Sequence, residues 1–567
     1  MINEMKNMRL VRKFCIVVAG FWLLLLGPTA SAQKIWLSAN SGSWENTNNW
    51  SSHVLPDDTS TVMITNNLTK TVTIDSAVAA VNLTIAGLNV YAPTGSTNTL
   101  VVNNGDTNNP LFLFNTLRVD TGGVVEVTNS ALAVDIGPKF IHINGELKLD
   151  SGIITLGDAT STTKVANATS GTLTINAGTV SAGVLKIGAD VPNATGSMNM
   201  SGGSLDVSSL FSIGHDAGTT GIVSMVGGQI NVTNDDLRIG DSGYGSLTLS
   251  NCTLLSTNIN VGRDALSVGQ LSIQNGAVLV VSNDVSIARF DGSTGTVVVA
   301  GGRLSMPGNK LYAGQEGNGQ LTISNGLVEA DSLLVAGGDT NTASGLFTMG
   351  GGQLTLSSSV SVGAPLLSTG QVSIAAGAIY VTNGSASASV SVPNGTLTVN
   401  GGSVTTDSLW LTNSTGTLVF NGGVLNTRNT TIANGAAFVV GNGITAATLN
   451  LTGGTHIFAN GLTISKNATL AGCGTIVGPI LNLGTIATNC VGGLVAPRIT
   501  ALSRVGRTNV ISFTTVVGQN YSLEFKNDLT NSTWTALPPT TNGNAGVISL
   551  KDTNATAPRR FYHVRAQ

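Results

Sequence analysis

Eight acidic side chains recur at nearly regular intervals along the middle of the sequence, and their type and spacing could support chemistry. Carboxylates held close together can act as the acid and base of a glycoside hydrolase. They can also bind Ca²⁺, which prefers oxygen ligands. Stacked about 5 Å apart, neighbouring carboxylates would repel by about 1 kcal/mol in water, and a bound cation would relieve this repulsion. The eight residues are Asp158, Asp190, Asp216, Asp241, Asp264, Asp291, Glu316 and Asp339.

The distance of each acid from the preceding glycine distinguishes a metal site from ordinary turn chemistry. Asp241 directly follows Gly240, whereas Asp216 and Asp264 each come two residues after a glycine. A column with such uneven offsets is a poor ladder of metal ligands, but an aspartate after a glycine turn readily accepts hydrogen bonds from the next backbone amides. We therefore expect turn chemistry, with Asp216, Asp241 and Asp264 as the alternative Ca²⁺ ligands and no other cofactor.

No other group of residues forms a distinctive catalytic cluster. Arg263 and Arg289, beside Asp264 and Asp291, come nearest to one, and surface ion pairs explain them. No Gly-x-Ser-x-Gly elbow or phosphate loop stands out from the glycine-rich background. The histidines are isolated from one another and lack the spacing of zinc ligands: His53, His142, His215, His456 and His563. We expect no catalytic residues, and the alternative is a polysaccharide lyase or glycoside hydrolase built on the same scaffold.

The elements that position these acids belong to a repeat of 24 to 26 residues. Paired corner residues such as Gly202-Gly203, Gly227-Gly228 and Gly401-Gly402 mark its period between residues 177 and 402. Each repeat contains short stretches in which apolar residues alternate with polar ones, for example at Leu173 and Ile175, and this alternation is typical of strands. Three short strands and three corners in each repeat predict one turn of a parallel β-helix, with turns stacked about 4.8 Å apart.

The composition supports an all-β fold. Charged residues make up 10% of the chain, hydrophobic residues make up 41%, and 71 of the 567 residues are glycine. Val, Ile, Thr, Ser, Asn and Gly favour strands and turns over helices. The predicted fold is therefore an all-β parallel β-helix followed by a small C-terminal β-sandwich.

The chain divides into four predicted regions. Residues 1–32 have a basic start, an apolar run and an Ala30-Ser31-Ala32 site, the pattern of a secretory signal peptide. Residues 33–95 are expected to form an N-terminal cap and the first strands, and residues 96–497 the repeat array. Residues 498–567 are expected to form about five strands around Tyr521 and Trp534. Cleavage at the predicted site would leave no transmembrane segment.

Removing the signal peptide leaves 22 basic and 28 acidic side chains, a net charge of −6. No basic cluster remains in the mature chain, so nucleic acid is not an expected partner.

Tryptophan and cysteine residues gather near the two ends of the predicted array. Trp36, Trp44 and Trp50 lie within fifteen residues, where they are expected to cap the open end of the coil. Stacking on sugar rings is the alternative use of these tryptophans. Cys252 is expected to be a lone thiol, and Cys473 and Cys490 are two residues that could pair in an oxidising compartment.

Several stretches resemble known repeat families of large bacterial surface proteins. "IGHDAGTTGIVSMVGGQINV" and "VGRDALSVGQLSIQNGAVLVV" are similar to type V secretion and PEP-CTERM-associated repeats. Residues 468–497 resemble the closing segment of autotransporter-associated β-strand repeats, and "GSWENTNNWSSHVLPDD" resembles the segment that often precedes such arrays. The C-terminal region resembles modules of secreted proteins from environmental bacteria such as Verrucomicrobia, which implies sorting, attachment or glycan binding. The chain departs from both repeat families because it ends in neither an outer-membrane barrel pattern nor a PEP-CTERM tail.

The resemblance implies a secreted parallel β-helix that acts in adhesion. We expect a secreted or cell-surface structural or adhesive protein whose partner is an extracellular polysaccharide or a cell surface. An ice-binding array is a third hypothesis, but it requires ranks of Thr-x-Thr. Among the eleven relevant strands only those with Thr172/Thr174 and Thr396/Thr398 supply both threonines.

Overall fold

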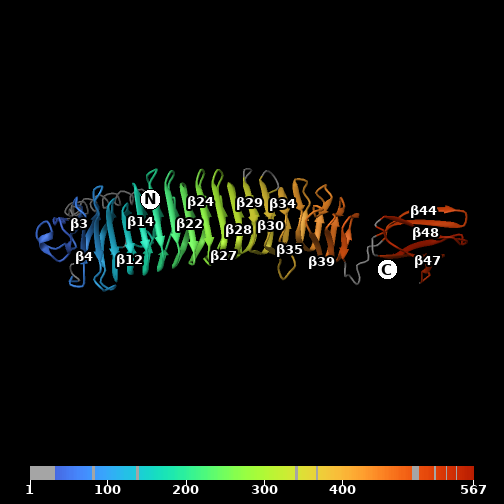
Figure 1. Cartoon of the computed structure of the whole chain (residues 1–567), viewed down its shortest axis with the longest axis horizontal. Helices are drawn as coiled ribbons and strands as arrows, with labels where there is room; N and C mark the ends of the chain where they lie inside the picture. Colours follow the sequence, from blue (N-terminus) through green and yellow to red (C-terminus); the bar gives the residue numbers. More distant parts are fainter. Residues whose placement is uncertain are drawn as a thin grey trace, which may run out of the picture.

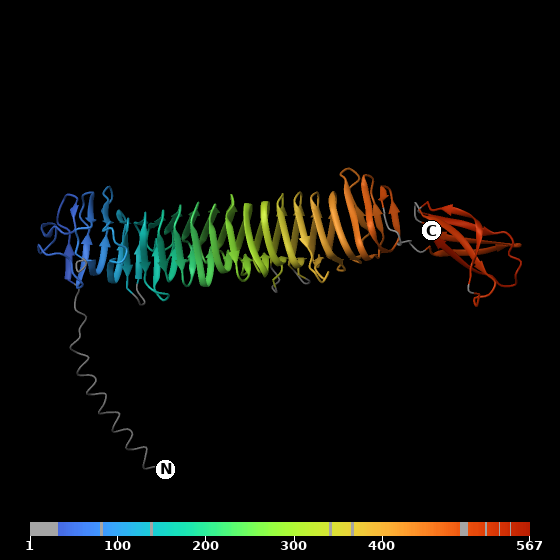
Figure 2. The same cartoon turned by 90° about the horizontal axis from the view of Figure 1, so that it is seen from below.

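The computed structural model describes residues 32–79, 83–135, 140–338, 343–364, 368–487, 497–515, 519–531, 533–544 and 546–566. Strands β1 to β43 pair in parallel, turn upon turn, and form a solenoid of about 17 turns. The turns stack into a straight rod that runs from β3 to β39 in Figure 1 and is seen from below in Figure 2. The predicted parallel β-helix is confirmed, whereas nearly all of the expected signal peptide lies outside the described residues.

The turn that begins at Ser170 illustrates how the sequence forms the coil. Leu173 and Ile175 point inward and are completely buried, whereas Thr172 and Thr174 between them face outward. In the next turn Leu173 pairs with Met198, so that inward residues stack on inward residues along the whole rod. The resulting columns form one continuous apolar core from Trp36 to Leu470.

Glycine is required at the corner between the first and second strands of a turn. Gly178 and Gly203 have φ angles of +83° and +75°, which favour glycine. A Cβ atom at Gly203 would lie 2.5 Å from the carbonyl oxygen of Gly178 in the turn before. The stacked glycine corners therefore allow the backbones of successive turns to approach closely.

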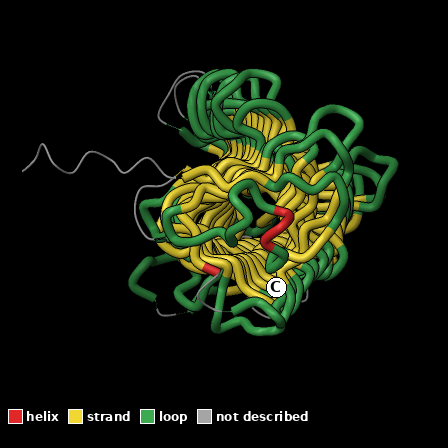
Figure 3. Tube along the Cα trace, turned by 90° about the vertical axis from the view of Figure 1, so that its left-hand side faces the viewer, coloured by secondary structure: helices red, strands yellow, loops and turns green. Residues whose placement is uncertain are grey.

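The solenoid begins earlier than the expected boundary at residue 96, because β1 already pairs with β3. Trp36, Trp44 and Trp50 follow β1, and the short 3-10 helix Thr47–Asn49 between them lies across the end of the coil in Figure 3. The first strands are β1 (Ala32–Ile35), β2 (Gly42–Ser43), β3 (Ser60–Ile64), β4 (Lys70–Ile74), β5 (Thr84–Val90), β6 (Asn98–Val102), β7 (Leu111–Val119), β8 (Gly123–Val127), β9 (Ser130–Val134), β10 (Phe140–Ile143), β11 (Glu146–Leu149), β12 (Gly152–Leu156) and β13 (Thr162–Val165).

The middle turns carry the regular repeat, and in several of them neighbouring strands merge into one long strand that bends around a corner. These strands are β14 (Ser170–Ile175), β15 (Thr179–Ala182), β16 (Val184–Ile187), β17 (Thr195–Met200), β18 (Ser204–Val207), β19 (Phe211–Ile213), β20 (Thr220–Met225), β21 (Gln229–Ile239), β22 (Tyr244–Ser250), β23 (Thr253–Val261), β24 (Val268–Gln274), β25 (Val278–Val281), β26 (Val285–Ile287), β27 (Thr294–Ala313) and β28 (Asn318–Val335).

The regular step persists to Gly395 in β34, and the next step, from Gly395 to Gly416, is shorter, as the falling repeat length predicts. Cys473 in β41 is disulfide-bonded. Its expected partner, Cys490, lies outside the described residues, so the pairing of these two cysteines stays a prediction. The strands are β29 (Ser344–Met349), β30 (Gln353–Val362), β31 (Thr369–Ile374), β32 (Ala378–Val381), β33 (Ser389–Ser391), β34 (Gly395–Val399), β35 (Ser403–Leu411), β36 (Gly416–Phe420), β37 (Gly423–Ile432), β38 (Phe438–Val440), β39 (Ala447–Phe458), β40 (Leu462–Ile464), β41 (Ala468–Val477), β42 (Ile480–Asn482) and β43 (Thr485–Ala487).

The C-terminal region forms a small sandwich of two three-stranded antiparallel sheets, ordered β44-β45-β48 and β47-β46-β49. Phe513 from one sheet and Tyr521 from the other share its core. Trp534 does not belong to that core, contrary to expectation: it packs beside His563 and under Lys526 at the surface. The strands are β44 (Ile499–Val505), β45 (Thr508–Thr514), β46 (Asn520–Lys526), β47 (Thr535–Asn542), β48 (Val547–Asp552) and β49 (Phe561–Ala566).

Candidate functional site

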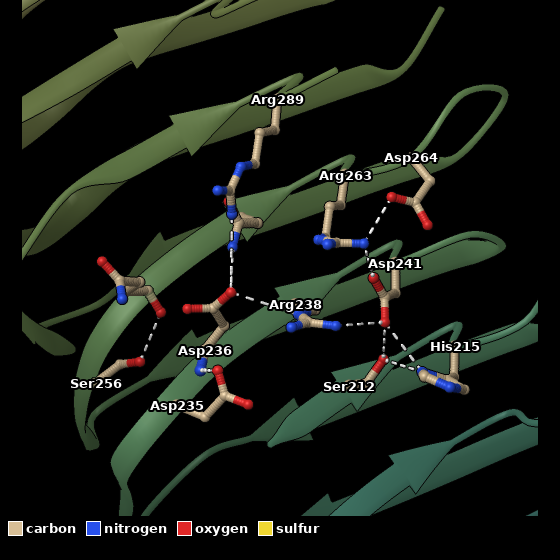
Figure 4. Close-up of polar contacts among 12 residues, drawn as sticks. Ser212, His215, Asp235, Asp236, Arg238, Asp241, Ser256, Arg263, Asp264 and Arg289 are labelled. Carbon is tan, nitrogen blue, oxygen red and sulfur yellow. Dashed lines mark hydrogen bonds and ion pairs between the residues drawn. The ribbon is translucent and has the colours of Figure 1, made fainter. Parts of the chain in front are cut away.

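Asp241, in the corner after β21, is the centre of a buried polar network. The residue is 2% exposed. The hydroxyl of Ser212, in the turn before, donates a hydrogen bond to Oδ2 of Asp241 over 3.1 Å. Nδ1 of His215 lies 3.0 Å from the same oxygen (Figure 4). One carboxylate oxygen therefore faces two polar side chains of the neighbouring turn.

Two guanidinium groups also approach Asp241. Nη1 of Arg238 lies 3.4 Å from Oδ2, and Nη1 of Arg263, in the turn after, lies 3.4 Å from Oδ1. The same nitrogen of Arg263 is 2.7 Å from Oδ1 of Asp264, which forms the expected ion pair. Arg263 is thus a cation placed between Asp241 and Asp264, two of the three aspartates considered as Ca²⁺ ligands.

A second acid extends the network along the solenoid. Oδ2 of Asp236 lies 3.5 Å from Nε of Arg238 and 3.8 Å from Nη1 of Arg289, two turns further on. Arg289 also donates a hydrogen bond to Asn260. The guanidinium groups of Arg263 and Arg289 lie 5.4 and 5.1 Å from the ring centre of Phe290, within the range of cation–π attraction. Arginines and acids therefore alternate over several adjacent turns.

The surroundings of Asp241 determine its protonation state. Burial alone would raise its pKa, but the hydrogen bond from His215 and the charges of Arg238 and Arg263 outweigh burial, so the pKa lies below its usual value. Asp241 is consequently ionised at neutral pH and has no proton to donate as a general acid.

Ser212, His215 and Asp241 do not have the arrangement of a nucleophilic triad. In such a triad the imidazole uses one nitrogen to accept the serine proton and the other to face the acid. Here Nδ1 of His215 faces both groups, at 2.9 Å from Oγ of Ser212 and 3.0 Å from the carboxylate. A nitrogen that faces a carboxylate carries its proton there and cannot act as a base for Ser212. The geometry fits a structural ion-pair network.

Two of the other recurring acids accept backbone hydrogen bonds, but from different places. Asp158 accepts hydrogen bonds from the backbone amides of Thr160 and Ser161, which is the expected turn chemistry. Asp216 instead accepts the backbone N–H of Asp190 in the preceding turn. Asp339 lies outside the described residues.

Ser212 and Arg238 were missed by sequence reasoning. Both residues lie in one outward column, next to the corner that carries Asp241, and they occupy adjacent turns. This placement is the signal that could have revealed them.

This outward column is cationic in the first half of the solenoid. The strand register places Arg118, His142, Lys164, Lys186, Ser212 and Arg238 one above another. Asp120 pairs with Arg118, and Lys164 lies 2.7 Å from Asp190. Burial lowers the pKa of Lys186, and its like-charged neighbour Lys164 lowers it further. The Asp241 network is thus the end of a longer charged band.

The three N-terminal tryptophans offer no surface to a sugar. Trp36, Trp44 and Trp50 are each 0% exposed. Trp50 packs edge-on against both of the others, with ring centres 5.1 and 4.9 Å apart. The alternative of glycan stacking by these residues is therefore wrong, because no ring face is accessible.

Divalent cations are expected to contribute little to the stability of the solenoid. Both oxygens of Asp241 already face cations or donors, and Asp264 is paired with Arg263. Adding a chelator should therefore shift the melting temperature by less than a few degrees, as measured by calorimetry with and without added Ca²⁺. A large fall that Ca²⁺ reverses would show that these acids are ligands.

Within the described part of the chain, no three His, Cys, Asp or Glu side chains gather in a way that could hold a metal ion. The described residues also contain no helix of the length and hydropathy that a membrane span requires. No family model, no curated protein and no solved structure matches this chain.

Proposed function

We propose that the chain is a secreted or cell-surface structural and adhesive β-solenoid that binds polysaccharide or cell surfaces along its wall without cleaving them. The basic start, apolar run and Ala30-Ser31-Ala32 site of the sequence support export. The Asp241 network supports a role without catalysis, because its charged groups satisfy one another.

The observation that carries this proposal is an outward column of small, uncharged, hydrogen-bonding side chains. It lies on the first face of the coil, which is formed by the first strand of each turn, such as β14 and β17. Strand pairing places Thr174, Asn199, Ser224, Thr248 and Ser272 in consecutive turns. After Val298 the column continues with Thr322, Thr348, Ser373 and Thr398. Turns spaced about 4.8 Å apart make this column about 43 Å long.

Such a column suits a long polymer better than a small molecule. Each hydroxyl or amide can exchange one or two hydrogen bonds with a sugar hydroxyl, and a single exchange with water gains little. Repeated contacts along one polymer add through effective concentration. We infer that binding is weak at each turn and becomes strong only over many turns.

Incubation of the mature protein with a panel of polysaccharides tests this function. We expect retention on at least one polymer and no release of oligosaccharides, measured by sedimentation and by assay of soluble reducing ends. Thr248→Ala should leave retention nearly unchanged, whereas the double change Thr248→Glu and Ser272→Glu should weaken it. Thr253→Glu is the matched control. Thr253 lies in the same turn as Thr248 but on the second face, which is formed by the second strand of each turn.

Release of oligosaccharides would contradict the proposal, most clearly if a single carboxylate substitution abolished that release. The alternative of a lyase or glycoside hydrolase would then replace it. Retention of none of the polymers would leave only the structural part of the proposal.

A further inference from the structure

One tryptophan in the second half of the solenoid is exposed. It lies on the third face of the coil, which is formed by the last strand of each turn, such as β16 and β19. Trp410, near the end of β35, is 49% exposed, whereas its neighbours Leu409 and Leu411 are 1% exposed. Alternation along the strand therefore fixes the two leucines inward and the indole outward. A large apolar ring held on a rigid sheet is a feature that the core does not require.

The neighbours of Trp410 in its outward column are small and carry hydroxyl groups. Strand pairing places Ser391 in the turn before and Thr431 in the turn after. Ser361 lies one turn beyond Ser391 in the same column. Serine and threonine are too short to cover an indole ring, so its surface stays open to a ligand and its immediate surroundings can form hydrogen bonds.

A second aromatic residue lies further along the same column. Tyr312 is followed by Leu334 and then by Ser361 in successive turns, which places it four turns from Trp410. At about 4.8 Å per turn this separation is about 19 Å. A polymer that followed the column would contact both rings.

The part of the solenoid between residues 343 and 465 is almost free of charge. Between positions 343 and 465 the sequence contains only two residues of the types Asp, Glu, Lys and Arg, namely Asp407 and Arg428. Asp407 is 8% exposed and accepts the backbone N–H groups of Asn383 and Ala388 at the corner. The column that is cationic from Arg118 to Arg238 is thus neutral around Trp410.

We propose that Trp410 is a stacking platform for a neutral polysaccharide that lies along the third face of the solenoid. The C–H groups on one side of a sugar ring carry a slight positive charge and are attracted to the negative face of an aromatic ring. The hydroxyls of Ser391 and Thr431 would bind sugar hydroxyls on either side of the stacked ring. The lack of charge favours a neutral polymer over an acidic one, which the cationic column would attract. This inference rests on the proposed function and adds to it a stacking site on a face other than that of the Thr248 column.

Substitution of Trp410 in the full mature chain tests the inference. We expect Trp410→Ala to weaken binding to a neutral glucan or chitin by about three- to tenfold, the range typical of one aromatic contact. Trp410→Phe should retain most of the affinity. Tyr380→Ala is the matched control, because Tyr380 is 38% exposed in the neighbouring turn but lies in a column of the second face. Unchanged circular dichroism and melting temperature would exclude misfolding.

The outcomes separate this inference from the function on which it rests. If the unmodified chain binds neutral polymers and Trp410→Ala binds them equally well, the stacking site is wrong and the adhesive function stands. If binding occurs only to acidic polymers such as alginate and is insensitive to Trp410, the cationic column is the site and the inference is also wrong. If the unmodified chain binds no polymer, the adhesive part of the proposed function fails together with this site.

Discussion

Replacing Asp241 with asparagine is expected to destabilise the turns around β21 by about 2 kcal/mol while leaving polysaccharide binding unchanged. Removing one member of a buried ion pair typically costs about 3–5 kcal/mol, because the other charge is left without compensation. The cost should be smaller here, since the side chains of Arg238 and Arg263 are 19% and 24% exposed and therefore partly hydrated. Each arginine also retains a second acid, Asp236 or Asp264.

Hydrogen exchange of the amides in β19, β21 and β23 is the most direct measurement, because a solenoid can open locally without unfolding as a whole. Asp264→Asn is the matched control: its side chain is 37% exposed, so the same chemical change should have little effect. Equal protection in both variants would show that the network contributes nothing to stability.

The stability of the Asp241→Asn protein and that of the unmodified chain should depend differently on pH. The pKa of Asp241 is lower in the folded chain than its ordinary value of 3.8. Its contribution to stability is therefore present above pH 3.8 and is lost as the pH falls through the folded pKa. The Asp241→Asn protein should lose less stability than the unmodified chain over that acidic range.

The fold could be predicted from the sequence because its information is periodic. A repeat of 24 to 26 residues with alternating apolar positions leaves few arrangements other than stacked turns, and the strand register of the middle turns follows that period directly. The inward positions at Leu173, Val223 and Leu247 needed only the alternation rule, and all three are buried.

The Asp241 network could not be predicted in the same way, because it depends on small differences between turns. Asp216, Asp241 and Asp264 each follow a glycine by one or two residues, so the sequence alone makes them look like equivalent turn residues. Their partners are set by side chains one turn away: in the same outward column Lys164 donates to Asp190, whereas Ser212 donates to Asp241. Side-chain length and corner geometry in adjacent turns decide such contacts, and neither is periodic.

The tryptophans show the opposite case, in which strand alternation predicts whether an indole is exposed. The clustering of Trp36, Trp44 and Trp50 near the start of the array predicts a cap, with sugar stacking as the alternative, and all three rings are buried. Trp410 stands alone in the sequence, but its position between Leu409 and Leu411 already predicts an outward indole. Strand alternation is therefore a better guide to an accessible ring than the local density of aromatic residues.

Replacing Trp50 with alanine is expected to open the N-terminal end of the solenoid. Trp50 is completely buried between Trp36 and Trp44, and its indole N–H donates a hydrogen bond to the carbonyl of Trp44 over 2.8 Å. Truncating a buried tryptophan typically costs about 3–5 kcal/mol. The loss should be confined to the first turns, because each turn of a solenoid contacts only its neighbours.

Opening this end would expose unpaired backbone groups along β1 and β3, and such edges pair readily with other chains. We therefore expect faster proteolysis within residues 32–90 and the appearance of oligomers by size-exclusion chromatography. Trp410→Ala is the matched control, because it removes the same side chain from an exposed position and should cause neither effect. An intact N-terminal end in the Trp50→Ala protein, combined with lost polysaccharide binding, would contradict a purely structural role. All three rings are 0% exposed, so Trp50 could contact a sugar only after the cap had opened. The expected result of Trp50→Ala is therefore a loss of stability at the N-terminal end of the solenoid.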